Sequence, residues 1–435
     1  MHVRVLVLLS LAVAAPAQDV APLKLTLRDA VGLALKQNPQ VILANLGVAQ
    51  SEQDRIIARS GLLPQAAAKT SEAVNRVNLE AAIGFKFSAF PQHVGPYWVN
   101  QGGLSFNAPI FDLTLWGRYR ASQIGIASSR AQETSVREQS VLLVVSQYLG
   151  SQRAAAEVQA AQSRVDLAQA LYDQAADLQK NGVGTGIDTL RANVQLQNEK
   201  QRLIVSRTQL ETSLFGLARL LNLDPRQKIE LADQVSFFDT PEVPADQTLE
   251  RAFQTRPELR QIVSQQQRAA VELKSAGDAR LPKVTATGFW AEQGVTGSNM
   301  IPVYQYQFNL EVPVFTGGRI EAERSQAEIA IRQLRQQEQE VRNRIALEVK
   351  TALAQVESAR SEVDVARLGV QLARQEVTQA RDRFQAGVAN NIEVVTAQDE
   401  LARANDNQIG ALYRYNQSRA DLARSVGQME ALYAK

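Results

Sequence analysis

The longest regular pattern in the sequence is a seven-residue repeat of apolar positions within residues 317–386. Valine or phenylalanine recurs at the a position and alanine at the d position, which is the spacing of a coiled coil. Gly369 alone interrupts the interior of this stretch. The pattern therefore predicts one helix of about 65 residues, which is about 100 Å long at about 1.5 Å per residue. The a positions are Val349, Val356, Val363, Val370, Val377 and Phe384, and the d positions are Ala352, Ala359, Ala366, Ala373 and Ala380.

The first half of the chain carries the same pattern, and alanine again replaces the leucine that a two-stranded zipper usually has at d. Small d residues let helix backbones approach closely, and the remaining faces are rich in Gln, Arg, Glu and Ser. This combination fits an ordinary coiled-coil rod, and it also fits a wide sheet of helices with water on one side. The a positions are Val144, Ser151, Val158, Val165 and Tyr172, and the d positions are Ala154, Ala161, Ala168 and Ala175.

A period of two replaces the heptads in residues 303–315 and predicts a β-strand with two different faces. Weaker alternation in 64–90, 97–111 and 283–293 predicts three further strands, so each half of the chain supplies one hairpin. Aromatic residues recur near the strand ends, as in the girdles of outer-membrane barrels. One face of the clearest strand has Tyr304, Tyr306, Phe308, Leu310, Val312 and Val314, and the other has Gln305, Gln307, Asn309 and Glu311.

Four strands are too few to close a barrel, for which about eight is the usual minimum. A sheet in lipid cannot have open edges, because its unpaired backbone groups find no water there. A membrane barrel must then be shared between copies of the chain. Two copies give about eight strands with a filled interior, whereas three give about twelve strands and a conduit, as in larger barrels. We favour three copies, and a soluble β-sandwich is the alternative to any barrel.

The chain is a tandem duplication, because the same motifs occur in the same order in both halves. The first structural repeat spans residues 18–222, the second spans 257–427, and the proline-containing connector between them spans 223–256. We expect β-hairpins at about 64–111 and 282–315, long helical hairpins at about 112–222 and 317–427, and a short C-terminal tail at 428–435. The matching motifs are Asn38-Pro39 with Arg256-Pro257, Leu63-Pro64 with Leu281-Pro282, Pro109-Ile110-Phe111 with Pro313-Val314-Phe315, Gly182-Val183 with Gly387-Val388, and Leu217-Ala218-Arg219 with Leu422-Ala423-Arg424.

The N-terminal sequence indicates the cellular compartment of the protein. Residues 1–17 have the features of a secretory signal peptide: a basic start, an apolar run of about ten residues and a small-residue cleavage site. No later segment has the roughly 18 uninterrupted apolar residues of a transmembrane helix. We therefore expect a protein that leaves the cytoplasm and is not held by a helix.

The composition excludes several kinds of site. The chain has no cysteine, which excludes disulfides, thiolate metal sites and lipid attachment through an N-terminal cysteine. The net charge of +2 gives no reason to expect a nucleic acid as partner. The chain has two histidines, His2 and His93, and His93 lies in a segment that we expect to be a surface loop. The acidic residues fall at positions that we expect to be solvated, so we predict no enzyme, no catalytic residue, no cofactor and no metal site.

The order and doubling of these motifs resemble the TolC-like outer-membrane efflux proteins. The resemblance covers nearly all of the chain after the signal peptide. It implies a mainly α fold with a membrane β part, in which a homotrimer shares a 12-stranded β-barrel, with four strands per chain. It also implies a long α-helical barrel and a mixed equatorial belt, located in the bacterial outer membrane and extending into the periplasm. The membrane-facing strand would present Tyr304, Tyr306, Phe308 and Leu310 to outer-membrane lipid.

Glycine turns at 182–186 and 387–391 join the long antiparallel helices, since glycine and asparagine accept the positive φ of a tight turn. The resemblance implies that a periplasmic adaptor docks at these turns and that the helices close the pore there. The positions that match the docking turns are Gly182, Val183, Thr185, Gly387, Val388 and Asn390.

Asp188 and Glu393 lie in the first turn of the helix after each glycine turn, where an acid stabilises the helix dipole by about 0.3–1 kcal/mol. The resemblance adds a second role, because acidic side chains near this turn line the constriction in the family. Glu393 matches the first such acid, whereas Thr396 stands where some relatives have a second. Three copies of Glu393 would still form a negative ring of the kind that cation channels use.

Together, the patterns and the resemblance predict the outer-membrane channel subunit of a tripartite efflux or type I export system. We expect passive conduction that begins when a periplasmic adaptor (membrane fusion) protein splays the helices, and an inner-membrane pump of RND or ABC type. Two alternatives are a periplasmic adaptor, which would have a single helical hairpin flanked by small β domains, and a soluble periplasmic coiled-coil scaffold. Nothing in the sequence identifies the cargo.

Overall fold

The computed structural model describes residues 22–85, 91–233, 244–295, 300–386, 388 and 391–434. The expected signal peptide at 1–17 lies outside these residues. The chain divides into two compact units, each assembled from separate stretches of sequence. Unit 1 comprises Met1–Val41, Arg137–Ala245 and Val349–Lys435, and unit 2 comprises Ile42–Val136 and Asp246–Glu348.

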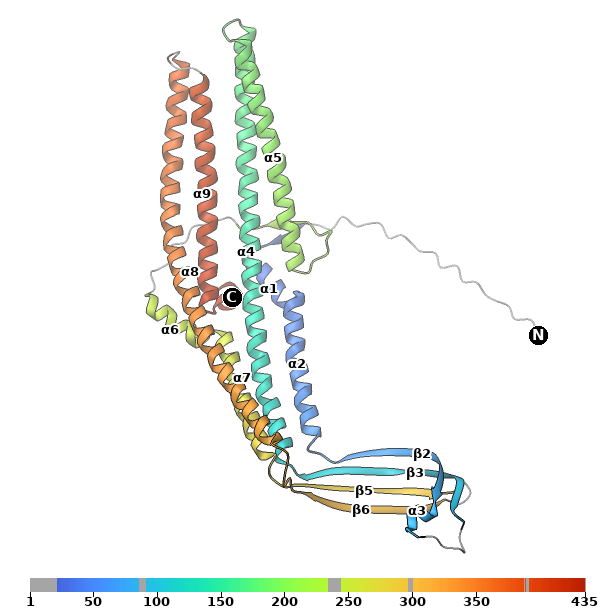
Figure 1. Cartoon of the computed structure of the whole chain (residues 1–435). Coiled ribbons are helices and arrows are strands. Elements are labelled where there is room, and N and C mark those ends of the chain that lie inside the picture. Colours follow the sequence, from blue (N-terminus) through green and yellow to red (C-terminus); the bar gives the residue numbers. More distant parts are fainter. Residues whose placement is uncertain are drawn as a thin grey trace, which may run out of the picture. The chain divides into compact units, whose positions relative to one another are not determined.

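Both long helices predicted from the heptads are present, and each turns back into a shorter antiparallel helix (Figure 1). The first long helix has 68 residues and the second has 67, and Gly369 does not interrupt the second. The first hairpin consists of α4 (Leu113–Lys180) and α5 (Gly186–Leu220), and the second hairpin consists of α8 (Arg319–Gln385) and α9 (Asn391–Ser425).

The predicted valine and alanine positions form the seam of each hairpin. Alanine at d brings the paired helices close, and in the first hairpin leucines of the shorter helix fill the space. In the first hairpin Ala161, Val165 and Ala168 pack against Leu196 and Leu203. In the second hairpin Ala359 and Val363 pack with Ala411 and Tyr415, and Val377 and Ala380 pack with Val394 and Ala397.

Unit 1 also contains a mixed α/β layer, which we call the belt. β1 (Leu23–Leu25) pairs in parallel with β4 (Ile229–Leu231), so the start of the described chain meets the connector between the repeats. α1 (Leu27–Gln37) follows β1 and begins with a capping box, in which Thr26 and Asp29 satisfy each other's backbone N–H groups. The predicted mixed belt is thus confirmed.

The core of the belt is built around Tyr148 of α4, which is fully buried. Its hydroxyl lies 3.0 Å from the Leu25 carbonyl oxygen and 3.0 Å from Oδ2 of Asp233. Burial away from water, with the Asp233 carboxylate nearby, raises the pKa of Tyr148 well above its ordinary value. The surrounding apolar core includes Leu25, Val31, Val144, Leu217, Leu221 and Met429.

The C-terminal segment is part of this core rather than a plain tail. Within residues 428–435, α10 (Met429–Tyr433) is helical, and Met429 is fully buried. Glu138 of α4 accepts hydrogen bonds from the backbone N–H groups of Met429 at 2.8 Å and Glu430 at 3.2 Å. Arg137 donates to the Glu430 carboxylate at 3.0 Å. The heptad and alternation patterns do not predict this helix, because it is a single short turn.

Unit 2 contains a four-stranded antiparallel sheet with strand order β2-β3-β5-β6, which confirms the prediction that each chain contributes four strands to the membrane β part (Figure 1). β2 and β6 are the two edge strands. Gly288 is required where β5 passes beneath two aromatic rings, because a Cβ there would lie 2.6 Å from Phe106 and 2.7 Å from Tyr306. The strands are β2 (Gln65–Asn78), β3 (His93–Phe111), β5 (Lys283–Gly294) and β6 (Ile301–Glu311).

The first hairpin of the sheet differs from its prediction at its far end. β2 ends at Asn78, whose side chain caps a short helix, α3 (Leu79–Ile83), where the alternation had suggested continued strand. His93 is the first residue of β3 rather than a loop residue, because pairing with β2 resumes beyond a bulge and reaches the Asn78–His93 pair.

Helices make up the remainder of unit 2. α2 (Pro39–Ser60), α6 (Ala245–Thr255) and α7 (Pro257–Asp278) accompany the first parts of α4 and α8. Two of these helices begin at the prolines of the duplicated motif, since proline fits the first helical position. Within the described ranges, no helix combines the length and the apolar character needed to cross a membrane.

Candidate functional site

The turn of the first hairpin is tight and exposed. Gly182 has a φ of 76°, which only glycine adopts readily. The N–H groups of Val183 and Gly184 both donate to the Leu178 carbonyl, at 3.0 and 2.9 Å, and close the end of α4. The side chain of Val183 is 78% exposed, so an apolar side chain stands in water at the end of this hairpin.

The acid that follows this turn is held by its own neighbours. Thr185 precedes α5, and its hydroxyl donates to Oδ2 of Asp188 at 2.5 Å. Arg191, one turn further along α5, is 4.0 Å from the other carboxylate oxygen of Asp188. Both contacts are local to the helix end, and Asp188 makes no ion pair with α4 within the described residues.

The acid after the second turn is held across the hairpin. Glu393 of α9 forms an ion pair with Arg383 of α8 at 2.9 Å. Val388 is 68% exposed in the turn, and Gly387 and Asn390 lie outside the described residues. The Thr396 hydroxyl donates to the Ile392 carbonyl at 2.9 Å and so is occupied within α9. A ring built from Glu393 would therefore carry arginines beside its carboxylates.

A charged network that the sequence analysis missed lies further along the first hairpin. Glu199 of α5 is 3% exposed, and it accepts a hydrogen bond from Arg202 at 2.8 Å. Arg164 of α4 lies 3.6 Å from Glu199 and donates to both carboxylate oxygens of Asp406 on α9, at 3.0 and 3.1 Å. This network ties the two hairpins of unit 1 together.

The expectation that the acids are solvated is wrong for Glu199 and Glu138, which are 3% and 5% exposed. Glu199 occupies a seam position between Leu196 and Leu203, which are three residues before it and four residues after it. The heptad spacing in the sequence could therefore have identified Glu199 as a buried carboxylate. Burial raises the pKa of Glu138, although the hydrogen bonds that it accepts from two backbone N–H groups oppose this shift.

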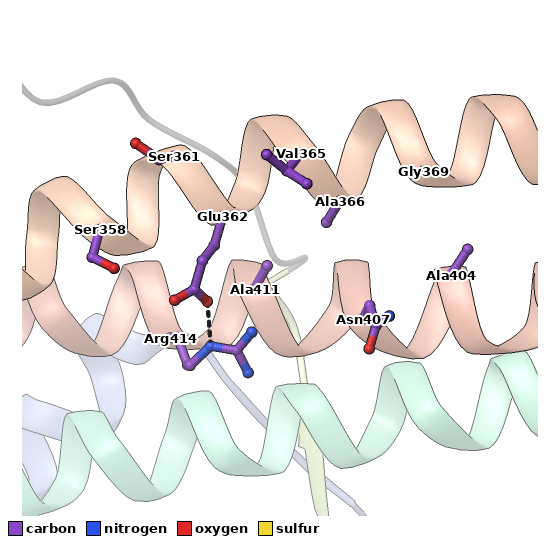
Figure 2. Close-up of a pocket in the computed structure, with 10 residues that line it drawn as sticks. All are labelled: Ser358, Ser361, Glu362, Val365, Ala366, Gly369, Ala404, Asn407, Ala411 and Arg414. Atoms are coloured by element: carbon purple, nitrogen blue, oxygen red, sulfur yellow. Dashed lines mark hydrogen bonds and ion pairs between the residues drawn. The ribbon is translucent and has the colours of Figure 1, made fainter.

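The second hairpin has a groove where the first hairpin has this network. The repeats are offset by 205 residues (Gly387 minus Gly182), so the counterparts of Arg164 and Glu199 are Gly369 and Ala404. Both line a groove of about 690 Å³ along α8 and α9, with the ion pair between Glu362 and Arg414 at 2.7 Å nearby (Figure 2). Small side chains thus occupy the two positions at which the first hairpin has charged side chains.

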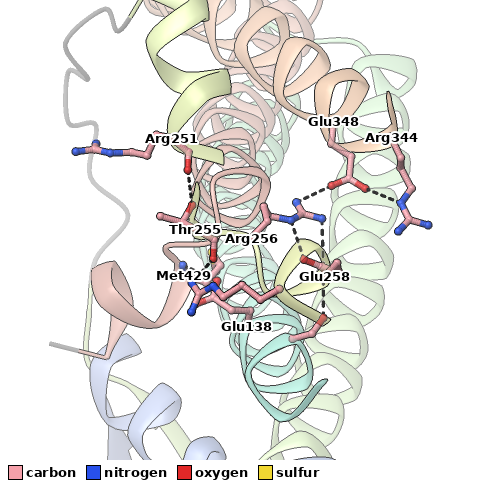
Figure 3. Close-up of polar contacts among 10 residues, drawn as sticks. Glu138, Arg251, Thr255, Arg256, Glu258, Arg344, Glu348 and Met429 are labelled. Carbon is pink, nitrogen blue, oxygen red and sulfur yellow. Dashed lines mark hydrogen bonds and ion pairs between the residues drawn. The ribbon is translucent and has the colours of Figure 1, made fainter. Parts of the chain in front are cut away.

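A buried arginine organises the helices of unit 2. Arg256, at the start of α7, is 2% exposed. It donates to Glu258 at 3.0 Å and to Glu348 of α8 at 2.7 Å, and Arg344 stands on the other side of Glu348 (Figure 3). Two carboxylates compensate the buried charge, so this cluster joins α7 to α8 without a free ionised group.

The sheet has one apolar face and one polar face. The cross-strand register places Tyr304 beside Trp290 and Leu104, and it places Tyr306 beside Gly288 and Phe106. The rings of Phe106 and Tyr306 lie 6.0 Å apart across Gly288. The four side chains expected to face a membrane are all exposed in the single chain: Tyr304 68%, Tyr306 63%, Phe308 79% and Leu310 68%.

The polar face carries a ladder of amides along β6. Gln305 donates to Gln307 at 3.5 Å, Gln307 donates to Asn309, and Asn309 donates to the Thr287 hydroxyl at 3.3 Å. These groups are uncharged and hydrogen-bond one another. In the part of the chain that the structure describes, no group of three or more His, Asp or Glu side chains is placed to hold a metal ion.

A comparison of amino-acid sequences shows the family to which this chain belongs. The sequence profile described as "Outer membrane efflux protein" matches residues 30–223 and 248–428, which include both repeats. The chain belongs to the outer membrane efflux protein family. No curated protein matches it in sequence.

Solved structures of outer-membrane channels share its fold. The Campylobacter jejuni CmeC outer membrane channel has a TM-score of 0.80 at 18% identity, over 92% of this chain and 85% of that chain. VceC, an outer membrane protein from Vibrio cholerae, has a TM-score of 0.75 at 17% identity, over 92% and 96%. The open state of the Neisseria gonorrhoeae MtrE outer membrane channel has a TM-score of 0.75 at 17% identity, over 92% and 88%.

Membership of this family settles the general function. The outer membrane efflux protein is a non-enzymatic channel subunit in the bacterial outer membrane that extends into the periplasm. The fold is that of a homotrimer which shares one barrel of strands and one barrel of helices. The family supplies the outer-membrane component of tripartite efflux systems, which also contain an adaptor and a pump. The soluble scaffold and the adaptor are not favoured.

Proposed function

We propose that the two hairpin turns of this efflux protein are its docking surface for the adaptor. The observation that carries this proposal is the pair of exposed valines, Val183 and Val388, at matching positions of the two repeats. Exposed apolar side chains at a turn offer binding energy to a partner and none to the isolated hairpin. Thr185 and Gly182 belong to the same surface, and we extend it to Gly387 and Asn390 by sequence.

Cysteine crosslinking tests this proposal, because the chain has no cysteine of its own. Val183→Cys and Val388→Cys, each carrying a photoreactive probe in cells, should crosslink to a periplasmic adaptor. The matched control is Leu143→Cys, at an apolar residue of α4 that is 47% exposed and distant in sequence from the turns. Equal adaptor capture by all three variants, or by none, would reject the docking turns.

We further propose that Asp188 and Glu393 stand at the constriction and that conduction through it is passive. The ion pair between Glu393 and Arg383 joins α8 to α9 next to the turn, so its loss would loosen the end of the second hairpin. Glu393→Ala should raise the single-channel conductance at rest or change its block by cations. Asp382→Ala, which removes an exposed charge beside Arg383, is the matched control. Identical currents in both variants would remove Glu393 from the gate.

The membrane-facing residues and the class of system complete the proposal. Tyr304, Tyr306, Phe308 and Leu310 would contact outer-membrane lipid, since one face of β6 is uniformly apolar and exposed. The channel would serve an inner-membrane pump of RND or ABC type, in tripartite efflux or type I export. Copurification from cells that carry a tagged adaptor identifies the pump; recovery of neither class contradicts this assignment.

A further inference from the structure

The polar face of the sheet has side chains from all four strands, which the cross-strand register aligns in rows. One row consists entirely of amide and hydroxyl side chains, and the next row, two residues further along each strand, mixes an amide and a hydroxyl with an alanine and a phenylalanine. Neutral groups of this kind donate and accept hydrogen bonds but carry no charge that favours one sign of ion. The first row is Gln65, Asn107, Thr287 and Gln307, and the second is Ala67, Ser105, Phe289 and Gln305.

Lys69 of β2 brings a positive charge to this neutral surface. It lies in the third row, and its side chain is exposed. Gly103, directly beside it, cannot be larger, because a Cβ there would lie 2.3 Å from the Trp290 carbonyl oxygen. The lysine side chain therefore has open space next to it. The other members of the row are Gly103, Ala291 and Val303.

The other charges on the polar face compensate one another and lie far from Lys69. The register pairs Lys283 with Glu311, and the Lys283 ammonium is also 3.5 Å from the Asp112 carboxylate. Glu311 is eight residues along β6 from the row of Lys69 (Glu311 minus Val303), which is about 27 Å at about 3.4 Å per residue. Among the residues that the structure describes, Lys69 therefore has no carboxylate partner on this face.

A hollow of about 450 Å³ on the polar face brings three kinds of group together. Lys69 supplies an ammonium group, Gln305 supplies amide N–H donors, and Phe289 supplies an aromatic ring. Ala67 and Ser105 also line the hollow, and their short side chains leave it open. This set of groups matches an anion with a flat apolar part, because its charge, its oxygen atoms and its ring each find a partner.

We propose that Lys69 makes this hollow a transient binding site for aromatic organic anions, such as carboxylates or sulfonates, as they pass through the channel. The proposal rests on the proposed membrane-facing side of the sheet, because the polar face lines the water-filled interior only if Tyr304 and its neighbours face lipid. The homotrimer then has three copies of Lys69 at one level of its shared barrel. Rings of lysine or arginine favour anions in pores.

The site is weak, as passage requires. An exposed charge pair at about 4 Å in water changes affinity by about fivefold, so an anion is attracted at Lys69 but soon leaves. The charge at the turn of the second hairpin has the opposite sign, and Arg383 compensates it at 2.9 Å from Glu393. The sheet, rather than the helical turns, would therefore discriminate between anionic and cationic cargo.

Single-channel recordings of the full-length trimer in planar bilayers test the site. Naphthalenesulfonate should block the current transiently, and Lys69→Gln should weaken this block by about fivefold. Naphthylmethylammonium, a cation of the same shape, should not lose potency in that variant. Lys69→Arg should keep the block, and Lys36→Gln, which removes an exposed lysine of α1, is the control for loss of charge elsewhere. Equal block of the parent and Lys69→Gln by naphthalenesulfonate would overturn the proposal.

The reversal potential in a potassium chloride gradient separates the charge from the ring. Lys69→Gln should move it toward cation selectivity, and Lys69→Glu should move it further in the same direction. Phe289→Ala should leave the reversal potential unchanged and weaken the block by naphthalenesulfonate about threefold or more, since the ring contact is lost. Full block in Phe289→Ala would contradict the assignment of the hollow as the binding site.

Thiol accessibility distinguishes failure of the anion site from failure of the proposed membrane face. The chain has no cysteine, so Lys69→Cys introduces a single thiol. A membrane-impermeant methanethiosulfonate should modify Lys69→Cys and change the current, whereas Tyr304→Cys in lipid should stay unmodified. Modification of Lys69→Cys without any effect of Lys69→Gln on block rejects the anion site alone. Modification of Tyr304→Cys but not of Lys69→Cys rejects the membrane face, and the anion site with it.

Discussion

The belt of unit 1 and the sheet of unit 2 contrast in where their apolar side chains lie. The belt buries Tyr148, Leu217 and Met429 completely within one chain. In the sheet, Phe308 is 79% exposed, and nearly every residue of β2 is exposed. The belt has the core of an ordinary globular protein, whereas the sheet has backbone pairing but no core of its own. The contrast shows which part of the fold the chain completes alone and which part relies on lipid and on other copies.

The largest effect should come from emptying the belt. Leu217→Ala removes a fully buried side chain and leaves a cavity in the belt core, so we expect the free energy of unfolding to fall by about 2–5 kcal/mol. Helical circular dichroism during denaturation measures it. Leu143→Ala, at a residue of α4 that is 47% exposed, is the control. A similar loss of stability in both variants would contradict the conclusion that the belt has a tightly packed core.

The next effect tests the two faces of the sheet with neighbouring residues. Phe308→Arg should destabilise the membrane-inserted barrel by about 2–4 kcal/mol, because it places a charge on the proposed lipid face. Gln307→Arg points to the other face and should cost far less. Reversible folding into lipid vesicles, followed by gel mobility, compares them. The proposed membrane face would be reversed if Gln307→Arg proved the more harmful.

A smaller effect concerns the polar centre of the belt. Tyr148→Phe removes the hydroxyl whose single proton lies between the Leu25 carbonyl and the Asp233 carboxylate, and it leaves both acceptors in place. We expect a loss of about 1–3 kcal/mol in unfolding free energy, the range for leaving buried partners unsatisfied. Chemical denaturation at neutral pH measures it. Stability equal to the parent would mean that water replaces the hydroxyl there.

The smallest effect is a pH dependence from Glu138. Burial raises the pKa of Glu138, so the folded state holds this proton more tightly than the unfolded chain. Its contribution to stability is therefore fully present below the ordinary carboxyl pKa and declines as pH rises through the raised value. Subtracting the denaturation midpoints of Glu138→Gln from those of the parent, from pH 4 upward, should give a falling difference that then levels. A rising difference would contradict it.

Local periodicity explains how much of this fold was readable from sequence. Val363 and Ala359 were predicted as seam residues because a heptad records burial at every turn of a helix. The turn at Gly182 was readable for a similar reason, since its conformation depends on adjacent residues. Partners distant in sequence were not readable: nothing near Arg164 indicates Asp406, and nothing near Glu138 indicates the helix that begins at Met429.

The candidate site likewise has some features that the sequence predicts and others that only the structure reveals. The exposed position of Val183 follows from the turn itself, so the sequence located it. The pairing of Glu393 with Arg383 depends on how α9 lies against α8, and a pattern within either helix does not specify it. The correspondence of Gly369 with Arg164 could be read from the duplication. The groove that Gly369 lines became visible only in the structure.

The two edge strands of the sheet have a consequence for biogenesis. β2 and β6 each present a row of backbone N–H and C=O groups that no other described strand of the same chain pairs. Such edges join to any strand that reaches them, so a newly made subunit can be captured by the wrong neighbour as readily as by the right one. A subunit is therefore exposed to mispairing from the time it leaves the cytoplasm until its edges are paired in the barrel.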